Sequence, residues 1–348
     1  MTYTSRATFL LFILLVSCKP ESSTENVEVE KTSNSPAPAA ENRYHFSQPV
    51  MGTTFQITCY SENESKARTA AFEAFQLAKE IELVCSDYTS KSEINRVLNT
   101  PRSLTVSDTL AEVLGFALIM AKETEGAFDP TIGHHTYNWR RAKAKQKLPD
   151  QETTDKAKSL TGWQKIWLSG DNVLHRSSDN LRVDLGGIAK GYAADKMLAL
   201  IKNHGIPSAM IAAGGDVRLG DAPPESDGWK VGIKNLTTST APANKLPYVI
   251  LKNCAISTSG DLHQYIEIDG TRYSHIVNPT TGLGLTRRVS ATVIAPTAIQ
   301  SDTLATASCV SQEYANKLLS KKTKIKLLLA EKNSQTNSTN FPTIHQQP

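Results

Sequence analysis

Two patterns of apolar residues meet in the stretch Asp184-Leu185-Gly186-Gly187-Ile188-Ala189-Lys190-Gly191-Tyr192-Ala193-Ala194-Asp195. Before it, apolar and charged residues alternate from Leu181 to Leu185, which predicts a half-buried strand, and after it apolar residues recur at helical spacing as far as Ile201. The two glycines between them favour a sharp turn, and the free N–H groups of the following helix favour an anion such as phosphate. The glycine spacing fits neither the dinucleotide fingerprint nor the P-loop, so a simple connection stays an alternative to a ligand site.

Length and composition indicate a globular chain. Of its 348 residues, 39% are hydrophobic, which is enough for a substantial core in one large domain or two ordinary ones. The formal net charge of +4 is small and indicates no nucleic-acid partner. Four cysteines, Cys59, Cys85, Cys254 and Cys309, could form disulfides in an exported protein, but each lies in an apolar setting, so buried free thiols are the alternative. No Cys/His cluster points to zinc.

The N-terminal residues have the pattern of a bacterial lipoprotein signal. Arg6 precedes an apolar run over residues 7–16 that is too short to span a bilayer, and Leu15-Val16-Ser17-Cys18 resembles a lipobox. We therefore expect residues 1–17 to be a signal peptide and Cys18 to carry lipid, with an uncleaved signal anchor as the alternative. Lys19, where Asp would favour the inner membrane, favours the outer membrane, with the protein facing the periplasm.

The rest of the chain divides by composition. Residues 18–42 are rich in Ser, Glu, Pro, Asn and Ala, which is typical of a flexible tether. The folded part is expected over residues 43–331, and residues 332–348 are a polar tail with little to bury. No internal repeat is present.

Strand and helix patterns alternate along the folded part, and several strand pairs have the spacing of hairpins. The expected helices are 66–84, 107–121, 189–201 and a last long one through Leu318 that Ser301 or Asp302 would cap; the expected strands include 55–59, 210–213, 229–233, 248–257, 289–295 and 324–330. Residues 140–162 are charged and predict an irregular surface excursion. Because hairpins accompany the alternation, we expect an α+β fold of mixed or antiparallel sheets with packed helices.

Three polar residues in the C-terminal part could carry chemistry. Asp302 and Thr306 are four residues apart on one predicted helix face, so their oxygens suit a hard cation such as magnesium. A helix cap and a packed threonine are the plainer alternatives. His275 stands in a loop rich in Pro and Gly, where a histidine is either a proton carrier or ordinary surface.

Four further residues give weaker signals. Thr258 and Ser259 could bind phosphate or only satisfy a turn. Met51 and Tyr88 could cover a flat aromatic ligand, but packing in the core is the commoner role of both residue types.

From Met51 to the last helix, the chain resembles the ApbE family of FAD:protein FMN transferases. The motifs that carry the resemblance are, in order, Met51-Gly52-Thr53, Ser86-Asp87-Tyr88, Ser92-Glu93-Ile94-Asn95, Gly126-Ala127-Phe128-Asp129-Pro130-Thr131, Asp184 to Asp195, Gly214-Gly215-Asp216, Thr258-Ser259-Gly260, His275 with Pro279, Thr281 and Gly282, and Ser301-Asp302 to Thr306-Ala307. A lipoprotein signal is also usual in that family.

The resemblance implies an enzyme and a site. It implies Mg²⁺-dependent transfer of the FMN half of FAD to a Thr or Ser hydroxyl of an exported or membrane flavoprotein subunit, with release of AMP. The acceptors would carry a motif of the type Asp-x-x-Thr/Ser-Gly/Ala-Ala-Thr. The carbonyl of Ala189, Asp302 and Thr306 would hold the metal, and His275 would take the proton of the hydroxyl, with Asp302 as the second catalytic residue. The implied nucleotide pocket consists of Met51, Tyr88, Asp129, Lys190 near the phosphates, Asp195, Gly214, Gly215, Asp216, Thr258, Ser259 and His275.

The chain departs from the family pattern at three positions. Asn278 stands where Asp is frequent, Leu236 where Pro is frequent, and Ala212 where Asn is common. None of these departures removes an implied metal ligand, so the transferase stays the main hypothesis. The alternatives are a lipoprotein that only binds FAD, and a pyrophosphatase that hydrolyses FAD to FMN and AMP without a protein acceptor.

Overall fold

The computed structural model of the chain describes residues 42–347 except positions 100, 263, 322 and 333. The predicted signal peptide, Cys18 and all but the last residue of the predicted tether lie outside the described residues. Within the described part, no helix is both long and apolar enough to cross a membrane.

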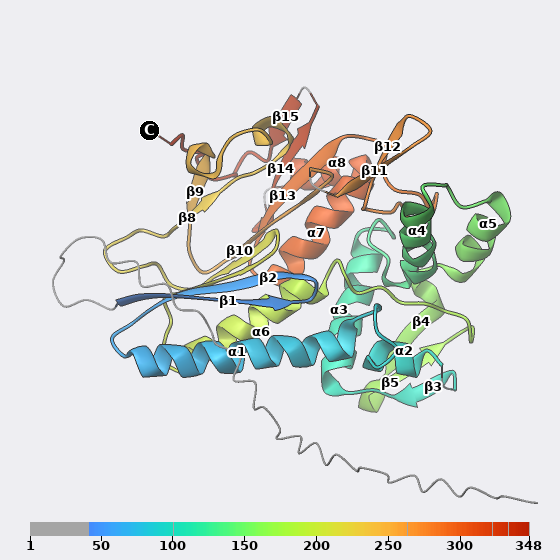
Figure 1. Cartoon of the computed structure of the whole chain (residues 1–348), viewed down its shortest axis with the longest axis horizontal. Coiled ribbons are helices and arrows are strands. Elements are labelled where there is room, and N and C mark those ends of the chain that lie inside the picture. Colours follow the sequence, from blue (N-terminus) through green and yellow to red (C-terminus); the bar gives the residue numbers. More distant parts are fainter. Residues whose placement is uncertain (1–41, 100, 263, 322, 333, 348) are drawn as a thin grey trace, which may run out of the picture.

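An antiparallel sheet of eight strands forms the centre of the fold, in the order β1-β2-β6-β7-β10-β13-β14-β15 (Figure 1). Its strands are β1 (Asn42–Val50), β2 (Thr53–Ser61), β6 (Ala209–Ala213), β7 (Asp216–Leu219), β10 (Ala255–Gly260), β13 (Val289–Ala295), β14 (Lys326–Glu331) and β15 (Ser334–Asn337). Met51 and Gly52 join β1 to β2 with φ angles of 52° and 69°. Two positive φ angles in a two-residue turn match the twist of an antiparallel hairpin.

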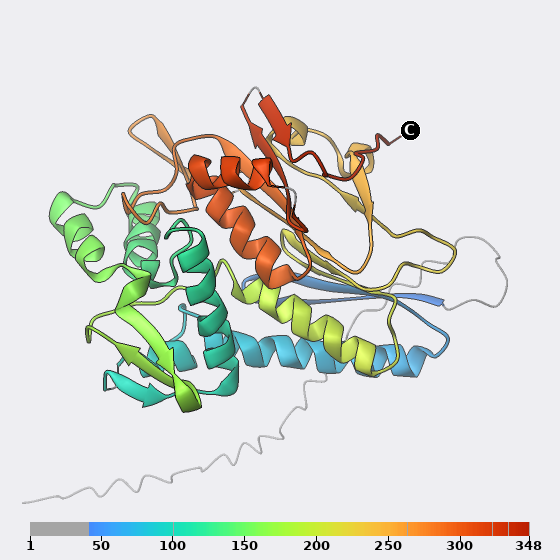
Figure 2. The ribbon, with the colours of Figure 1, turned by 180° about the vertical axis from the view of Figure 1, so that it is seen from behind.

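Long helices cover one face of this sheet. They are α1 (Glu64–Cys85), α6 (Ala189–Asn203) and α7 (Ala298–Val310). α6 packs on β6 and β7, and α7 packs on β10 and β13 (Figure 2). α1 buries alanines at helical spacing, including Ala67, Ala70, Ala74 and Ala78, and these small side chains allow the close contact between α1 and α6.

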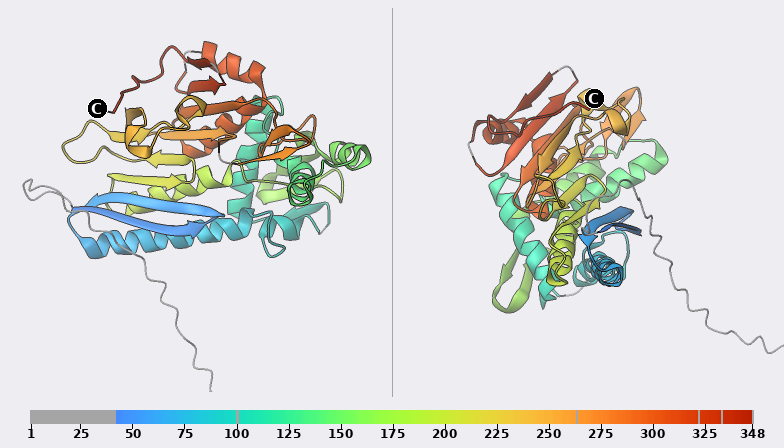
Figure 3. Two further views of the ribbon diagram at one scale, coloured as in Figure 1. Left: turned by 45° about the horizontal axis from the view of Figure 1, so that its top comes forward. Right: turned by 90° about the vertical axis from the view of Figure 1, so that its left-hand side faces the viewer.

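Three smaller sheets and further helices surround the large sheet in the described part of the chain. β8 (Trp229–Gly232) and β9 (Tyr248–Leu251) form a pair whose apolar side chains pack on the other face of the large sheet. A lobe at one end contains α2 (Glu93–Val97), α3 (Asp108–Glu123), α4 (Gly133–Lys145), α5 (Gln151–Leu160) and a sheet ordered β3 (Ser103–Thr105), β5 (Val173–Arg176), β4 (Ile166–Ser169) (Figure 3). The hairpin of β11 (Tyr265–Ile268) and β12 (Thr271–Ser274) shares a small apolar cluster with α4.

The predicted α+β class is confirmed, but residues 181–185 do not form the predicted strand. Leu181, Val183 and Leu185 are buried, as their alternation predicts, yet the segment joins no sheet. The backbone N–H of Asp184 instead donates to the carbonyl of Pro130 at 2.8 Å. Alternation therefore identified the side chains that face the core but did not require a neighbouring strand.

The predicted irregular excursion at 140–162 is wrong, because α4 continues to Lys145 and α5 follows it. Few side chains of these helices turn inward, among them Trp139 and Ala142 in α4 and Ala157 in α5. Helices that lie on the surface of a lobe need only a narrow apolar stripe, so their sequence shows little helical periodicity. The side chain of Asp150 caps α5 by accepting from the N–H of Thr153 at 2.8 Å.

One strand prediction needs correction, and the polar tail has more structure than its composition indicates. The expected strand 248–257 splits into β9 and β10, since Asn253 adopts a φ of 51°, a left-handed conformation that asparagine tolerates and a regular strand does not. The tail is not without structure: β15 pairs with β14, and Phe341 and Ile344 pack on the apolar cluster of β8 and β9.

The last helix is two helices. α7 begins at Ala298, so Ser301 and Asp302 lie inside it and do not cap it as predicted. The chain then breaks at Ser311, whose side chain caps α8 (Gln312–Ser320). Placing Asp302 in the interior of α7 frees its carboxylate for contacts outside the helix.

Three cysteines of the folded part are free thiols, as the alternative to disulfides predicted. Cys85 and Cys309 are buried free thiols, and Cys254 is a half-buried one. Burial is the main reason that the pKa of Cys85 rises to about 12, so this thiol is inert at neutral pH.

Gly191 sets the distance between α6 and α7, and we predict that Gly191→Ala destabilises the protein by about 2–3 kcal/mol. A Cβ at this position would lie 2.3 Å from the carbonyl oxygen of Ala298, so the two helices would have to separate. Urea denaturation followed by circular dichroism measures the change in free energy of unfolding. Gly170→Ala is the matched control, because a Cβ there meets nothing within 4 Å. Equal stability of the two variants would contradict the close packing.

Candidate active site

Lys190, in the first turn of α6, lies between two carboxylates that come from distant parts of the chain. Its Nζ is 3.2 Å from Asp302 Oδ2 in α7 and 3.3 Å from Asp216 Oδ2 at the start of β7. It also donates to the carbonyl of Gly186 at 3.1 Å, and the N–H of Gly191 donates to Asp302 Oδ2 at 3.3 Å. The predicted site residues Lys190, Asp216 and Asp302 therefore form one cluster, which we call the Lys190 cluster.

The Lys190 cluster has more negative than positive charge. Both carboxylates are 3% exposed, and a single ammonium faces them. Burial, followed by the negative charge of Asp216, raises the pKa of Asp302 to about 7 although Lys190 acts in the opposite direction. Burial opposes the charge of Lys190, but the two carboxylates raise its pKa above the usual range, so the ammonium keeps its proton. A second cation would relieve the remaining repulsion.

Hydroxyl groups adjoin the Lys190 cluster one turn along α7. Thr306 Oγ1 is 3.2 Å from Ser259 Oγ at the end of β10. A Cβ built on Gly187 would lie 3.6 Å from Thr306 Oγ1 and 3.4 Å from the ring of Phe128, so the glycine turn lies directly against both side chains. The predicted pairing of Asp302 and Thr306 on one helix face thus points toward the start of α6.

These oxygens fit a hard cation with few protein ligands. Asp216 Oδ2 is buried and has no hydrogen bond besides its ion pair with Lys190, so it has capacity for another positive partner. Asp302, Thr306 and the carbonyl of Ala189, the first residue of α6, are the residues that could hold the ion. No group of three His, Cys, Asp or Glu side chains in the described part is placed to bind a metal.

His275 follows β12 in a loop and has a defined tautomer. Its Nδ1 is 3.1 Å from the carbonyl of Gln264, and a carbonyl can only accept, so Nδ1 carries the proton and Nε2 is free to accept one. Partial desolvation lowers the pKa of His275, and the charges of Lys190 and Lys143 lower it further, while the Gln264 carbonyl and Asp261 act against them. A neutral imidazole at pH 7 suits a general base.

Tyr88 is exposed, and an arginine stacks on its ring. Its side chain is 80% exposed, and the guanidinium of Arg140 lies 4.4 Å from the centre of its ring. Arg140 also forms an ion pair with Asp87, and burial together with the nearby charge of Asp184 raises the pKa of Asp87. No hydrogen bond or ion pair between described residues joins Tyr88 to the Lys190 cluster.

Four other predicted pocket residues lie in turns and strands of the large sheet. Gly214 and Gly215 form the turn between β6 and β7, directly before Asp216. The carbonyl of Gly215 accepts from the N–H of Thr258 at 3.1 Å. The hydroxyl of Thr258 is engaged with Thr292 at 2.9 Å. Met51 lies in the β1–β2 turn and packs partly on the main core.

Asp195 and Asp129 bind backbone rather than the Lys190 cluster. Asp195 accepts from the N–H groups of Ala298 and Ile299 at 3.0 and 2.9 Å and is 2.7 Å from Arg218, so it fixes the start of α7.

Asp129 likewise accepts hydrogen bonds from backbone N–H groups, including one in its own turn. It accepts from the N–H and the hydroxyl of Thr131 at 2.8 and 2.6 Å and from the N–H of Trp163 at 3.0 Å. The prediction that either carboxylate also touches a nucleotide stays a prediction.

Sequence reasoning did not find three basic residues of the site region. Arg140 and Lys143 fell in the segment expected to be irregular, and Arg218, two residues after Asp216 in β7, showed no motif. The run of basic residues that begins at Arg140 was the pattern that could have pointed to them. Its relation to the site became evident only from the position of α4 beside the loop of His275.

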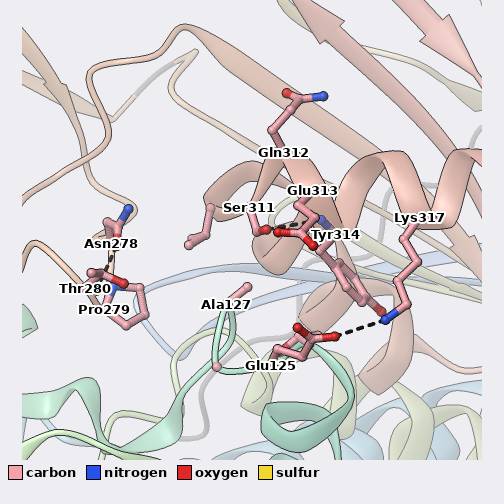
Figure 4. A pocket seen from close by; sticks show the side chains of 13 residues that line it. Glu125, Ala127, Asn278, Pro279, Thr280, Ser311, Gln312, Glu313, Tyr314 and Lys317 are labelled. Atoms are coloured by element: carbon pink, nitrogen blue, oxygen red, sulfur yellow. Dashed lines mark hydrogen bonds and ion pairs between the residues drawn. The ribbon is translucent and has the colours of Figure 1, made fainter.

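A pocket of about 460 Å³, within the size range of small-molecule sites, is lined by residues 124–127, 278–280 and the start of α8. Figure 4 shows the Asn278–Thr280 loop on one side of it and the side chains of α8 on the other. Tyr314 lines it with a buried hydroxyl that has no hydrogen-bond partner among the described residues. Asn278 accepts from the N–H of Thr280 at 2.8 Å, so the departure from Asp leaves this turn intact.

Comparison with known proteins places these residues in a family. The sequence model of the ApbE family matches residues 51–329. The FAD:protein FMN transferase of Vibrio cholerae is 30% identical over 296 residues, which is 83% of this chain and 87% of that protein.

Two solved structures resemble the fold. The flavin transferase ApbE from Vibrio cholerae superposes with a TM-score of 0.77 at 27% identity, covering 86% of this chain and 98% of that one. The ApbE protein from Thermotoga maritima gives a TM-score of 0.72 at 27% identity, covering 88% and 97%. Since the family model spans every residue of the Lys190 cluster and most of the described chain, this protein belongs to the ApbE family.

Proposed function

We propose that this chain transfers the FMN half of FAD to a Thr or Ser hydroxyl of a partner protein and releases AMP. The observation that carries the proposal is the Lys190 cluster, in which buried carboxylates and hydroxyls converge on the start of α6 within the residues of the family match. Relatives that span most of the chain bear the name FAD:protein FMN transferase.

We further propose that magnesium is the cation that the excess negative charge requires. Asp302, Thr306 and the carbonyl of Ala189 would hold it. When bound, it would neutralise charge on the phosphoryl oxygens of the substrate. The buried, incompletely compensated carboxylates Asp216 and Asp302 support this proposal.

The residues of this chain have definable tasks in the transfer. Lys190 is the positive group of the cluster and would contact the pyrophosphate at the start of α6, while the bound cation would offset the two carboxylates. The acceptor oxygen forms a bond to the phosphorus of the FMN half, and the bond from that phosphorus to the bridging oxygen breaks, so AMP leaves. His275 Nε2 takes the hydroxyl proton and later passes it to solvent.

Two alternatives use the same pocket. Hydrolysis of FAD to FMN and AMP needs only water in place of the acceptor hydroxyl. A lipoprotein that binds FAD without transfer would have no use for a neutral His275 or for the charge imbalance of the Lys190 cluster. Both observations therefore favour the enzyme.

For the location we propose a lipid-anchored protein that faces the periplasm. The pattern of residues 1–18 supports this proposal, with Cys18 as the lipid attachment site. Such a location would bring the site to exported or membrane flavoprotein subunits. Mass spectrometry of the membrane-extracted protein tests it through the mass of the modified N-terminal peptide.

Transfer itself is tested with the soluble chain from Lys19 onward, FAD, magnesium and a domain bearing the acceptor motif. We expect an FMN adduct on the acceptor and an equal amount of AMP, both by mass spectrometry, and loss of both with EDTA. Asp302→Ala should lower the rate by at least about 10³-fold, because the ion loses its carboxylate ligand. FAD that binds and stays whole would contradict the transferase, and AMP without an adduct would favour the pyrophosphatase.

The pH dependence tests the role of His275. Because its pKa is lowered, the imidazole is neutral at pH 7, and the rate should fall only as the pH drops below the usual histidine pKa of about 6.5. His275→Gln should be about 10²–10⁴-fold slower and should lack this acid limb. An unchanged acid limb in the variant would assign the titration to another group.

Removal of charge at Asp302 should stabilise the metal-free protein. A carboxyl whose pKa is raised from 3.8 to about 7 costs the folded state stability as the pH rises through that window. In EDTA at pH 8, we expect Asp302→Asn to melt about 2–5 °C above the wild type, and at pH 4 we expect no difference. Added magnesium should raise the melting temperature of the wild type only. A variant less stable than the wild type at pH 8 would contradict the charge imbalance.

A further inference from the structure

In the described part of the chain, a single carbonyl group binds the imidazole of His275. The backbone around His275 is fixed separately, because the N–H of Ser274 donates to the carbonyl of Leu285 at 2.8 Å and the N–H of Leu285 donates to Ile276 at 2.9 Å. The imidazole has its hydrogen bond from Nδ1 to the carbonyl of Gln264, at 3.1 Å. The position of the Gln264 carbonyl therefore decides which nitrogen of His275 carries the proton.

Arg272 contacts the chain before and after Gln264. Its Nε donates to Oδ2 of Asp261 at 2.9 Å, and its Nη2 donates to the backbone carbonyl of Asp261 at 2.7 Å. The same guanidinium lies 3.2 Å from the centre of the ring of Tyr265, the residue that follows Gln264. Tyr265 pairs with Ser274 in the β11–β12 hairpin (Figure 1), and Arg272 is two residues before Ser274, so both side chains project from one face of the hairpin. We call Arg272, Asp261 and Tyr265 the Arg272 clamp.

Neutralisation of charge does not explain all the contacts of Arg272. Asp261 is 3% exposed and requires a cation, but Arg288 already supplies one, with its Nε 2.9 Å from the same Oδ2. Arg272 adds a hydrogen bond to the backbone of Asp261 and a stacked contact with Tyr265, and both of these contacts fix position. They depend on the planar fork of the guanidinium, which a lysine of equal charge does not have.

We propose that the Arg272 clamp sets the tautomer of His275, so that Nδ1 carries the proton and Nε2 is the base. Arg272 is then a positioning residue, since it acts through the carbonyl of Gln264. This inference rests on the proposed function, because the transfer gives His275 its task as a base. When the carbonyl of Gln264 is displaced, the Nε2–H form becomes populated, and in that form Nε2 cannot accept a proton.

The tautomer is measured by NMR of the chain from Lys19 onward, labelled with ¹⁵N at histidine, at pH 8 without FAD or metal. The ¹⁵N shift of an imidazole nitrogen differs widely between its protonated and unprotonated forms, and the signals of His275 are those missing from His275→Gln. In the wild type, we expect Nδ1 to be protonated and Nε2 to be unprotonated. In Arg272→Lys, which keeps the charge and loses the fork, we expect the Nε2–H form to become the major one.

The transferase assay follows the same change as a loss of rate. Because only the Nδ1–H form is competent, kcat of Arg272→Lys should fall about tenfold, with the Kd for FAD and the KM for the acceptor domain unchanged. Arg288→Gln is the matched control, because it removes a cation from the same carboxylate and leaves the contacts of Arg272 in place. It should keep the tautomer and the kcat of the wild type.

A second variant tests the ring of the clamp. Tyr265→Leu removes only the stacked contact, so it should raise the population of the Nε2–H form by less than Arg272→Lys does. Circular dichroism shows whether each variant is folded. Tyr265→Leu also decides the proposal if Arg272→Lys does not fold.

The outcomes separate the two proposals. An unchanged tautomer of His275 in the folded clamp variants would overturn the inference. An equal change of tautomer in Arg288→Gln would overturn it too, because charge and not position would then set the tautomer. A changed tautomer with an unchanged kcat would overturn the role of Arg272 in the transfer. No adduct with the wild type would overturn the proposed function, and the NMR spectra would still decide whether the clamp sets the tautomer.

Discussion

The ion pairs of Lys190 with Asp216 and Asp302 are the constraint on which the site depends. Buried charges are costly unless they are paired, so the start of α6, the start of β7 and the interior of α7 must meet within about 3 Å of one ammonium. That approach is sterically possible because Gly191 has no side chain where α6 crosses α7. The order β6-β7-β10 in the sheet brings Asp216 to the same place.

The Lys190 cluster contributes little to the stability of the fold. Two carboxylates share one ammonium, and a well-packed apolar core would be at least as stable. Other contacts compensate: Asp195 ties the start of α7 to α6 and to Arg218, so the position of Asp302 does not depend on its own ion pair. The fold holds this unfavourable charge in place, and the proposed cation would offset it.

The sequence predicted the local part of this arrangement and not the long-range part. Spacing placed Asp302 and Thr306 on one helix face, and the glycine turn before α6 was evident, because both depend on residues a few positions apart. The ion pair of Lys190 with Asp216 depends on sheet order, which local pattern does not encode. Alternation at 181–185 described burial without pairing, and α4 was missed because few of its side chains reach the core.

The excess negative charge of the Lys190 cluster has a consequence for the choice of nucleophile. Asp216 and Asp302 would repel carboxylates of an acceptor from the interior of the site. A neutral Thr or Ser hydroxyl meets no such repulsion and can approach His275. The charge pattern would thus favour a hydroxyl as the attacking group even on an acceptor rich in carboxylates.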